Sequence, residues 1–539
     1  MFLATLALPF LGGVVLALLP APRLAARLNI LTSSLTFLCS LLLAAEVLRH
    51  APIDTPGGWF HLDAYNTFLV ALTAFVGMTT TIFSGPYMRH ELEIGRVTPR
   101  RMRLYHSMYQ QFQFGMLLGF TTNNIGVLWV SLELATLATV LLVSLYRTPE
   151  SIAAAWKYFI ICGMGIALAL FGTVLIFFTS SAVLGHGNAA LMWTELFAHA
   201  HALDPTVMSV AFCFLMVGYG TKIGLVPMHA WLPDAHGEGP TPISAVLSGL
   251  LLNLALYALV RCKMLVDGAT GSGMAGHMMI GFGLLSLLTA ALSLHKQSDI
   301  KRMFSFSSVE HMGLMTLAFG IGTQLSTFAA LLHMTAHSLV KSGIFFAVGH
   351  AAQAMGTQRM AQIRGLIAHH PGIGWGLLIG TAAIAGFPPF GVFMSEFLLF
   401  TATLERYPWL VAPLLLGLLV AMAGLFRFVQ PMVFGTPPEQ ARTVQPEMTA
   451  SQEAGIRDQD GRVRRDLADA TDGFVRGSKT ARFDRRQAKS PRTDFLRFEP
   501  DMAPVYIHFA LALLLGLSIP LVLSGWYRQA AALIVGVGA

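Results

Sequence analysis

The composition indicates a membrane protein rather than a soluble enzyme. Of the 539 residues, 55% are hydrophobic and only 12% are charged, whereas a soluble domain is about 25% charged. The chain has no Walker A motif, dinucleotide fingerprint, C-x-x-C pair or H-E-x-x-H, so we expect no cofactor and no redox centre. The net charge of +7 requires no nucleic-acid partner, because basic residues in cytoplasmic loops account for it.

Apolar segments recur along almost the whole chain. Because a span needs roughly 20 apolar residues, the sequence predicts an all-α polytopic membrane protein with about fourteen transmembrane helices. The first segment lacks a basic start and a convincing cleavage site, so we interpret it as a retained helix. The expected spans are 1–20, 28–48, 64–87, 108–121, 124–146, 155–179, 206–227, 240–260, 273–294, 302–321, 325–350, 374–400, 408–434 and 503–525.

Lysine and arginine concentrate in alternate loops. Because cytoplasmic loops are enriched in these residues, we expect a multi-pass protein of the plasma or inner membrane with both termini outside the cytoplasm. The opposite loops carry little beyond Arg49, Arg261, Lys263 and Arg406. The basic loops carry Arg23, Arg27, Arg89, Arg96, Arg100, Arg101, Arg103, Arg147, Lys296, Lys301, Arg302, Arg359 and Arg364.

The stretch 216–253 places Lys222 inside an apolar segment that breaks at Pro227. A charge at membrane depth costs about 2.5–3.5 kcal/mol and marks a functional candidate. Glu133, in the apolar segment IGVLWVSLELATLATVLLVSLY, is the natural partner. A desolvated lysine releases its proton more readily, and a nearby carboxylate reverses this, so the pair could switch between holding and releasing a proton. The alternatives are a fixed salt bridge between helices and a lysine that snorkels to the interface.

A second set of polar residues lies in the segment 325–350. His333, His337 and Lys341 are spaced i, i+4 and i+8, so they lie on one face of a helix. Histidine titrates near neutral pH, and this ladder could relay protons along that face. The alternatives are metal binding by the histidine pair, for which no further close ligand is evident, and hydrogen bonding to neighbouring helices.

The segment 374–400 is predicted to be a second broken helix. Pro388 and Pro389, with Gly386 before them, interrupt it, and Glu396 lies in its second half. Two broken helices are typical of transporters built from inverted repeats.

We place the two repeats at 108–260 and 273–434. Glu310 is then a candidate counterpart of Glu133, although an ion pair between Glu310 and His311 explains it equally well.

Four polar residues follow Lys222 on the expected cytoplasmic side: His229, Asp234, His236 and Glu238. They could form a proton entry route, or they could cap helices and bind one another. Lys301 and Arg302 are most simply anchors at the cytoplasmic surface.

Residues outside the two repeats form three further parts. Residues 1–107 hold the first three helices, and 503–539 hold the last helix and a tail. The segment 436–502 holds over a third of the charged residues of the chain and few large apolar ones, so it cannot bury a core. It is either a solvated cytoplasmic insertion or a docking segment for a partner subunit.

Several of these motifs resemble one membrane-protein family. GTKIGLVPMHAWLPDAHGEGPTPISAVLSG, DIKRMFSFSSVEHMG, HSLVKSGIFF and the SLEL around Glu133 are similar to the antiporter-like, proton-translocating subunits of respiratory complex I, group 4 hydrogenases and multisubunit Na+/H+ antiporters. AAWKYFIICGMGIALALFGT and SSVEHMG resemble most the hydrogenase-4 component F branch.

The resemblance implies fourteen helices, two inverted five-helix repeats and a central polar axis. It assigns that axis to Glu133, Lys222, His333, His337, Lys341 and Glu396. The implied function is a non-catalytic subunit that moves H+, with Na+ as the alternative ion, inside a redox complex of other membrane and peripheral subunits. The alternatives are a cation/proton antiporter subunit, a proton-flux subunit of an inorganic-carbon uptake complex, and a scaffold with a dead channel.

One position departs from the family pattern. Many complex I relatives carry a central lysine in the helix where this chain has Asn253. Asparagine cannot hold a charge, so a water bridge between Lys222 and the histidine face of 325–350 would be needed.

Overall fold

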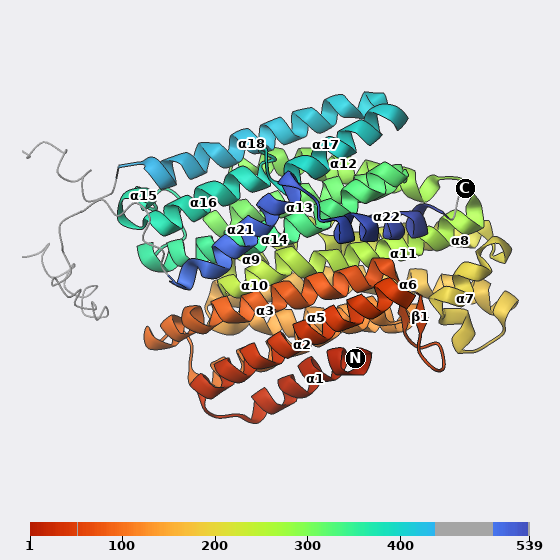
Figure 1. Ribbon diagram of the computed structural model, residues 1–539, viewed down its shortest axis with the longest axis horizontal. Helices are drawn as coiled ribbons and strands as arrows, with labels where there is room; N and C mark the ends of the chain where they lie inside the picture. Colours follow the sequence, from red (N-terminus) through yellow and green to blue (C-terminus); the bar gives the residue numbers. More distant parts are fainter. Residues whose placement is uncertain (51, 437–499, 537–539) are drawn as a thin grey trace, which may run out of the picture.

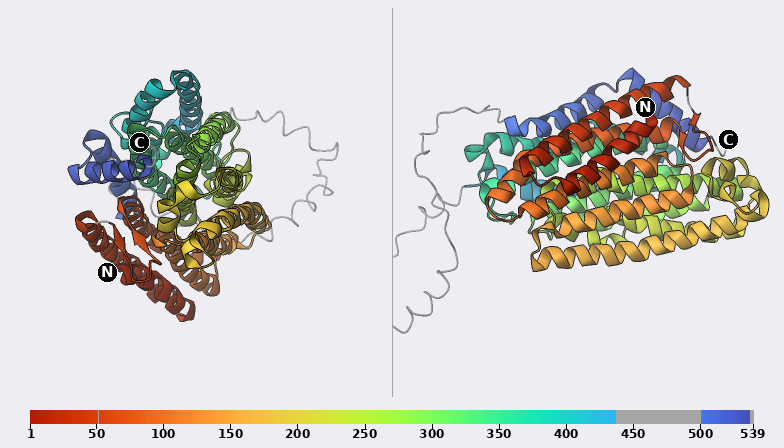
Figure 2. Two further views of the ribbon diagram at one scale, coloured as in Figure 1. Left: turned by 90° about the vertical axis from the view of Figure 1, so that its right-hand side faces the viewer. Right: turned by 90° about the horizontal axis from the view of Figure 1, so that it is seen from below.

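The computed structural model describes residues 1–50, 52–436 and 500–536, and this part of the chain is almost entirely helical. The charged segment expected at 436–502 therefore falls almost wholly outside the described residues. The long helices run side by side along the long axis of the molecule (Figure 1). Seen along that axis, they form one bundle with the first two helices at its edge (Figure 2, left).

The first half of the chain contributes the lower part of the bundle in Figure 1. A short antiparallel hairpin, β1 (Ile53–Asp54) and β2 (His61–Leu62), joins its second and third helices. The helices are α1 (Phe2–Leu18), α2 (Pro22–His50), α3 (Ala64–Glu93), α4 (Pro99–Thr121), α5 (Ile125–Val143), α6 (Pro149–Leu184), α7 (Trp193–Ala198), α8 (Pro205–Ile223), α9 (Leu232–Glu238), α10 (Thr241–Val246) and α11 (Leu252–Thr270).

The second half completes the bundle, with α18 at the top of Figure 1. Its helices are α12 (Met274–Leu294), α13 (Ile300–Ile321), α14 (Gln324–Met355), α15 (Leu366–His369), α16 (Pro371–Ile384), α17 (Gly391–Arg406), α18 (Val411–Phe434), α21 (Ala503–Leu517) and α22 (Leu521–Val535). Each expected apolar segment coincides with a helix or a broken helix.

Many of these helices are long and apolar enough to cross a membrane. In the described part of the chain, nine meet this requirement, and the bent pair α21–α22 gives a tenth. Helices α1 and α16 are apolar but shorter. The chain is therefore a helical membrane protein, while the exact number of spans remains a prediction.

The centre of the bundle is formed by α14 and by the continuous stretch α10–α11. The apolar windows of Thr241–Thr270 and Gln324–Met355 are completely buried, whereas those of α2, α6, α12 and α18 are 33–44% buried. The central stretch contains one wide π-helical turn, Leu247–Leu251. Such turns are rare and frequently lie at functional sites.

The two predicted helix breaks are present. Helix α8 ends at Ile223, and a short 3-10 turn, Met228–Trp231, leads into α9. Helix α16 ends at Ile384, and α17 begins at Gly391 after the Pro388–Pro389 pair. Proline has no N–H to donate and clashes with the preceding turn, so neither helix continues through its break.

The loops group at two ends of the bundle. At one end, the basic loops contact one another: Arg101 donates to the Tyr146 carbonyl, and residue 299 pairs with Arg359. At the other end, Phe2 contacts Phe60 of the hairpin, and the Trp526 indole donates to the Ala64 carbonyl. Figure 1 accordingly places both termini away from the end of the bundle at which α18 ends.

The expected single helix over 503–525 is wrong. Helices α21 and α22 meet at residues 518–520 with a bend of 75°. Pro520 directly precedes α22, and a residue before proline disfavours helical backbone, so the apolar run cannot continue as one helix.

Candidate ion-translocation site

Lys222 and Glu133 are brought together where α8 ends against α5. The Lys222 ammonium donates to Glu133 Oε2 at 3.2 Å and to Thr136 Oγ1 at 2.6 Å. The Lys222 side chain is completely buried, whereas the Glu133 side chain is 21% exposed. The snorkelling alternative is wrong, because a snorkelling lysine keeps its ammonium in water.

The break after Lys222 is held by aromatic residues. The Trp231 indole donates to the Thr221 carbonyl at 2.8 Å, which satisfies a backbone group released where α8 ends. Tyr158 of α6 stacks on Trp231 with ring centroids 4.5 Å apart, and its hydroxyl is 2.9 Å from Thr139 Oγ1. These contacts fix the non-helical backbone in protein, which is where such backbone is tolerated at membrane depth.

Asn253 is the second residue of α11, just after the π-helical segment, and links the two halves of the chain. Its amide donates to Ser338 Oγ of α14 at 2.8 Å and to the Gly249 carbonyl at 3.1 Å. Its Oδ1 is buried and has no hydrogen-bond partner among the described residues. Nearby, the hydroxyls of Ser248 and Ser308 are 2.7 Å apart. The position carries no charge, but it is lined by polar groups that can bind water.

Lys341 is the second buried lysine of the central region. It is completely buried and donates to the Phe304 carbonyl at 2.9 Å rather than to a carboxylate. Glu310 lies on the same helix as Phe304, α13, and its Oε2 is buried without a hydrogen-bond partner in the described chain. The structure therefore differs from the first half, where lysine and glutamate are in direct contact.

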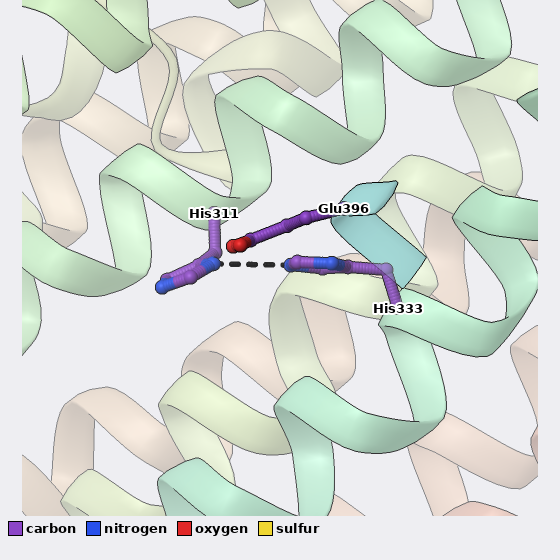
Figure 3. Close-up of side chains that lie close together, drawn as sticks. All are labelled: His311, His333 and Glu396. Carbon is purple, nitrogen blue, oxygen red and sulfur yellow. Dashed lines mark hydrogen bonds between the residues drawn. The ribbon is translucent and has the colours of Figure 1, made fainter. Parts of the chain in front are cut away.

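His333, His337 and Lys341 follow one another at i, i+4 and i+8 on α14, which is consistent with one face of that helix. His333 also bonds to neighbouring helices: its Nε2 is 3.0 Å from His311 Nδ1 (Figure 3), and its Nδ1 is 2.9 Å from Ser395 Oγ. The ring of His337 is stacked with that of His333 and tilted against that of His311, with centroids 6.4 Å and 5.6 Å apart. Neither nitrogen of His337 has a hydrogen-bond partner among the described residues. His311 contacts His333, and no Glu310–His311 ion pair appears in the described part.

Glu396 approaches this histidine pair from the second broken helix (Figure 3). Its carboxylate is buried, and Oε1 has no hydrogen-bond partner in the described chain. It lies so close to Gly386 that an added Cβ at that glycine would clash with Oε2. The backbone of Gly386 is also left-handed, with φ 71°. The break therefore needs glycine at this position.

The polar residues after Lys222 are separated by the fold. Asp234 binds Lys157 and Arg302, each at 2.6 Å, so it acts as a structural link. His236 is buried, with Nδ1 2.8 Å from the Leu232 carbonyl and Nε2 without a partner among the described residues. His229 is half-buried beside Phe306. The histidines and Asp234 therefore do not bind one another.

Lys301 is not a surface anchor. Its side chain is completely buried, and the ammonium donates to the Gly239 carbonyl at 2.8 Å, next to the end of α9. Arg302 fits the anchor interpretation better, because its side chain is 42% exposed.

An ion cluster at the opposite end of the bundle was missed by the sequence analysis. Arg261 binds Asp63 at 2.5 Å, and its guanidinium lies 4.2 Å from the Trp193 ring centre. His61 Nδ1 is 2.7 Å from Asp54, and Nε2 is 3.5 Å from Asp63. Asp63 caps α3, so an aspartate just before a long apolar helix was the available signal.

Charges within this cluster shift two pKa values. Burial alone lowers the pKa of His61, but the hydrogen bond and charge of Asp63 outweigh it and raise the pKa above 6.5. Burial alone raises the pKa of Asp63, but Arg261 and His61 outweigh it and hold the pKa well below its ordinary value. The Asp63 carboxylate and the Arg261 guanidinium are therefore both ionised at neutral pH.

Together, the fold and these residues define a class of protein. A membrane bundle with two broken helices and buried lysine, glutamate and histidine side chains is the architecture of an ion-translocating protein. The chain belongs to the NADH:quinone oxidoreductase/Mrp antiporter transmembrane family, whose model matches residues 122–422.

Known relatives cover most of the chain. It is 50% identical to the hydrogenase-4 component F homolog of Methylacidiphilum infernorum over 80% of this chain and 90% of that one. It is 28% identical to NADH-quinone oxidoreductase subunit N of Desulforudis audaxviator, over 82% and 85% of the two chains. A chain of an archaeal membrane-bound sulfane sulfur reductase shares the fold, with a TM-score of 0.79, 22% identity and coverage of 100% and 98%.

Proposed function

We propose that the chain is a proton-translocating membrane subunit of a multisubunit redox complex. The observation that carries the proposal is the completely buried Lys222 bound to Glu133 at a helix break. The driving energy would come from redox chemistry in partner subunits. The names of the relatives, a hydrogenase-4 component F homolog and an NADH-quinone oxidoreductase subunit, support this context.

The proposed path crosses the centre of the bundle. It runs from Glu133 and Lys222 past the hydroxyls and amide around Asn253, then to His337 and Lys341, and leaves through the His311–His333 pair and Glu396. Asn253 has a direct hydrogen bond to α14, which supports a link between the halves at this point. Water would carry the proton between groups that are not in contact.

We propose H+ rather than Na+ as the translocated ion. The buried site contains two lysines and three histidines on α8, α13 and α14. Na+ prefers oxygen ligands, which none of these five side chains offers, whereas all five can carry a proton.

The proposal includes an arrangement in the membrane. The fourteen predicted spans would form two inverted five-helix repeats, at 108–260 and 273–434, with the two helix breaks at corresponding positions. The end that carries the basic loops would face the cytoplasm, and both termini would lie on the other side. The 21% exposure of the Glu133 side chain supports contact with a neighbouring subunit at this residue.

Replacing Lys222 tests the proposal. Lys222→Ala removes the buried ammonium, and we expect the assembled complex to lose redox-driven proton pumping while electron transfer persists. The measurement is proton uptake into vesicles that contain the whole complex. Lys157→Ala is the matched control, because it removes a lysine that is 43% exposed and bound to Asp234. Full pumping by an assembled Lys222→Ala complex would contradict the proposal.

A further inference from the structure

Three helices bring a set of metal-ligating side chains together at the second helix break. His311 of α13, His333 of α14 and Glu396 of α17 each offer one ligand atom, and these atoms lie within 4.8 Å of one another (Figure 3). All three residues are buried. The histidine pair considered from sequence, His333 and His337, lacked a third ligand, whereas this set has one.

The spacing of the two nitrogens fits a tetrahedral metal. His311 Nδ1 and His333 Nε2 are 3.0 Å apart. Zn–N bonds of about 2.0–2.1 Å at a tetrahedral angle separate two nitrogens by about 3.3 Å. A shift of a few tenths of an ångström would therefore admit the ion. Glu396 Oε1, which has no hydrogen-bond partner in the described part, is free to complete a His2Glu set.

A neighbouring hydroxyl holds His333 in the tautomer that binds metal. Ser395 Oγ donates its proton to the Val392 carbonyl at 2.7 Å, so it accepts from His333 Nδ1–H at 2.9 Å. His333 Nε2 therefore keeps its lone pair and accepts from His311 Nδ1–H. Metal binding would need His311 to move its proton from Nδ1 to Nε2. Partners of this kind orient metal-binding histidines in known sites.

We infer that His311, His333 and Glu396 form a binding site for a divalent transition metal of the Zn2+ type. Two imidazoles and one carboxylate suit Zn2+ or Co2+, whereas Mg2+ and Ca2+ prefer ligands that are all oxygen. The carboxylate offsets one of the two positive charges of the ion. A bound ion would occupy the lone pairs through which His311 and His333 exchange a proton. That inhibitory consequence rests on the proposed function, but the binding does not.

Metal binding can be measured on the full chain without measuring proton flux. The probe is Co2+, whose visible absorption becomes intense in a four-coordinate site, followed by displacement with Zn2+ and equilibrium dialysis. For this measurement the protein is purified without a histidine tag. We expect one such site per chain in the wild type. His311→Gln and Glu396→Gln each remove one ligand and should weaken binding more than tenfold.

Two further variants separate a ligand role from a fold effect. His337→Gln is the matched control, because it removes a buried histidine one turn from His333 on the same helix but outside the set, and binding should persist. Ser395→Ala keeps all three ligands and should weaken binding by about 10- to 100-fold, as loss of an orienting partner does. Absence of the four-coordinate Co2+ spectrum in the wild type would overturn the inference. Equal loss of binding in His337→Gln and the ligand variants would overturn it as well.

Discussion

At the scale of single residues, the charged residues of the site could be predicted from the sequence, whereas the uncharged ones could not. Lys222 and Glu133 stand out because a charge in an apolar segment is rare. Thr136 and Ser395 do not stand out, because serine and threonine are common in membrane helices. Their hydroxyls can form a hydrogen bond with a backbone carbonyl of their own helix. Their partners, Lys222 and His333, come from other helices, so only the fold identifies them.

The environment of Gly386 leads to a prediction about stability. Gly386→Ala places a Cβ against Glu396 Oε2 and forces a non-glycine residue into left-handed backbone. We expect it to destabilise the chain by at least about 1–2 kcal/mol, the cost of such backbone in other residues. The measurement is thermal unfolding of the purified protein in detergent.

Gly163→Ala is the matched control. Gly163 lies inside α6, and an added Cβ there meets no atom within 4 Å. Because alanine favours a helix more than glycine does, this substitution should be neutral or stabilising. Equal unfolding temperatures for the two variants would show that the contact between Gly386 and Glu396 does not constrain the break.

At the scale of helices and strands, most of the architecture could be predicted from the apolar segments and from proline. The breaks at Pro227 and at Pro388–Pro389 follow from the lost N–H and the steric clash of proline. The π-helical turn Leu247–Leu251 could not be predicted, because its sequence, LSGLL, contains no proline and no signal specific to a wide turn. Only the fold shows that Gly249 in this turn lies against Ser342 of α14. The bend between α21 and α22 was missed although Pro520 marks it, because the apolar composition continues on both sides of that proline.

The cluster that joins β2, α3 and α11 gives a prediction about pH. The pKa of His61 is raised in the folded protein, so protonated His61 stabilises the fold fully below about pH 6.5. That contribution is lost as the pH rises through the raised value. We expect the free energy of unfolding of the wild type to exceed that of His61→Gln at acid pH.

The difference between the two proteins should shrink as the pH rises. Unfolding by denaturant in detergent at a series of pH values measures it. The stabilisation that comes from Asp63 has the opposite pH dependence: it is lost as the pH falls. Because the pKa of Asp63 is lowered, it stays ionised until the pH is strongly acidic. A stability difference that grows with rising pH would contradict the assigned role of His61.

At the scale of the whole molecule, the bundle has two chemically different ends. One carries the basic loops, and the other carries the hairpin and the Arg261–Asp63 pair. The sequence could predict this polarity, because the rule for basic loops depends on composition alone. It could not predict that Arg261 and Lys301 are buried, since each lies at a predicted helix end where exposure is the ordinary expectation.

Helix α12 offers a matched pair of positions that tests the orientation. Ser272 and Ser298 are both exposed, and they lie beyond opposite ends of α12. In a chain without its four natural cysteines, an impermeant maleimide should label Ser272→Cys in intact cells. Ser298→Cys should react only after the membrane is opened. The reverse pattern would show that the basic end faces outward.

The complete burial of α10–α11 and α14 also has a mechanical consequence. A change in bilayer thickness acts on helices that touch lipid, which respond by tilting. Here those helices are the peripheral ones, α2, α6, α12 and α18, whereas the central pair is covered by protein. The hydrogen bond between Asn253 and Ser338 is therefore shielded from the bilayer. A change in membrane thickness would therefore change the tilt of the outer helices without changing the distance between Asn253 and Ser338.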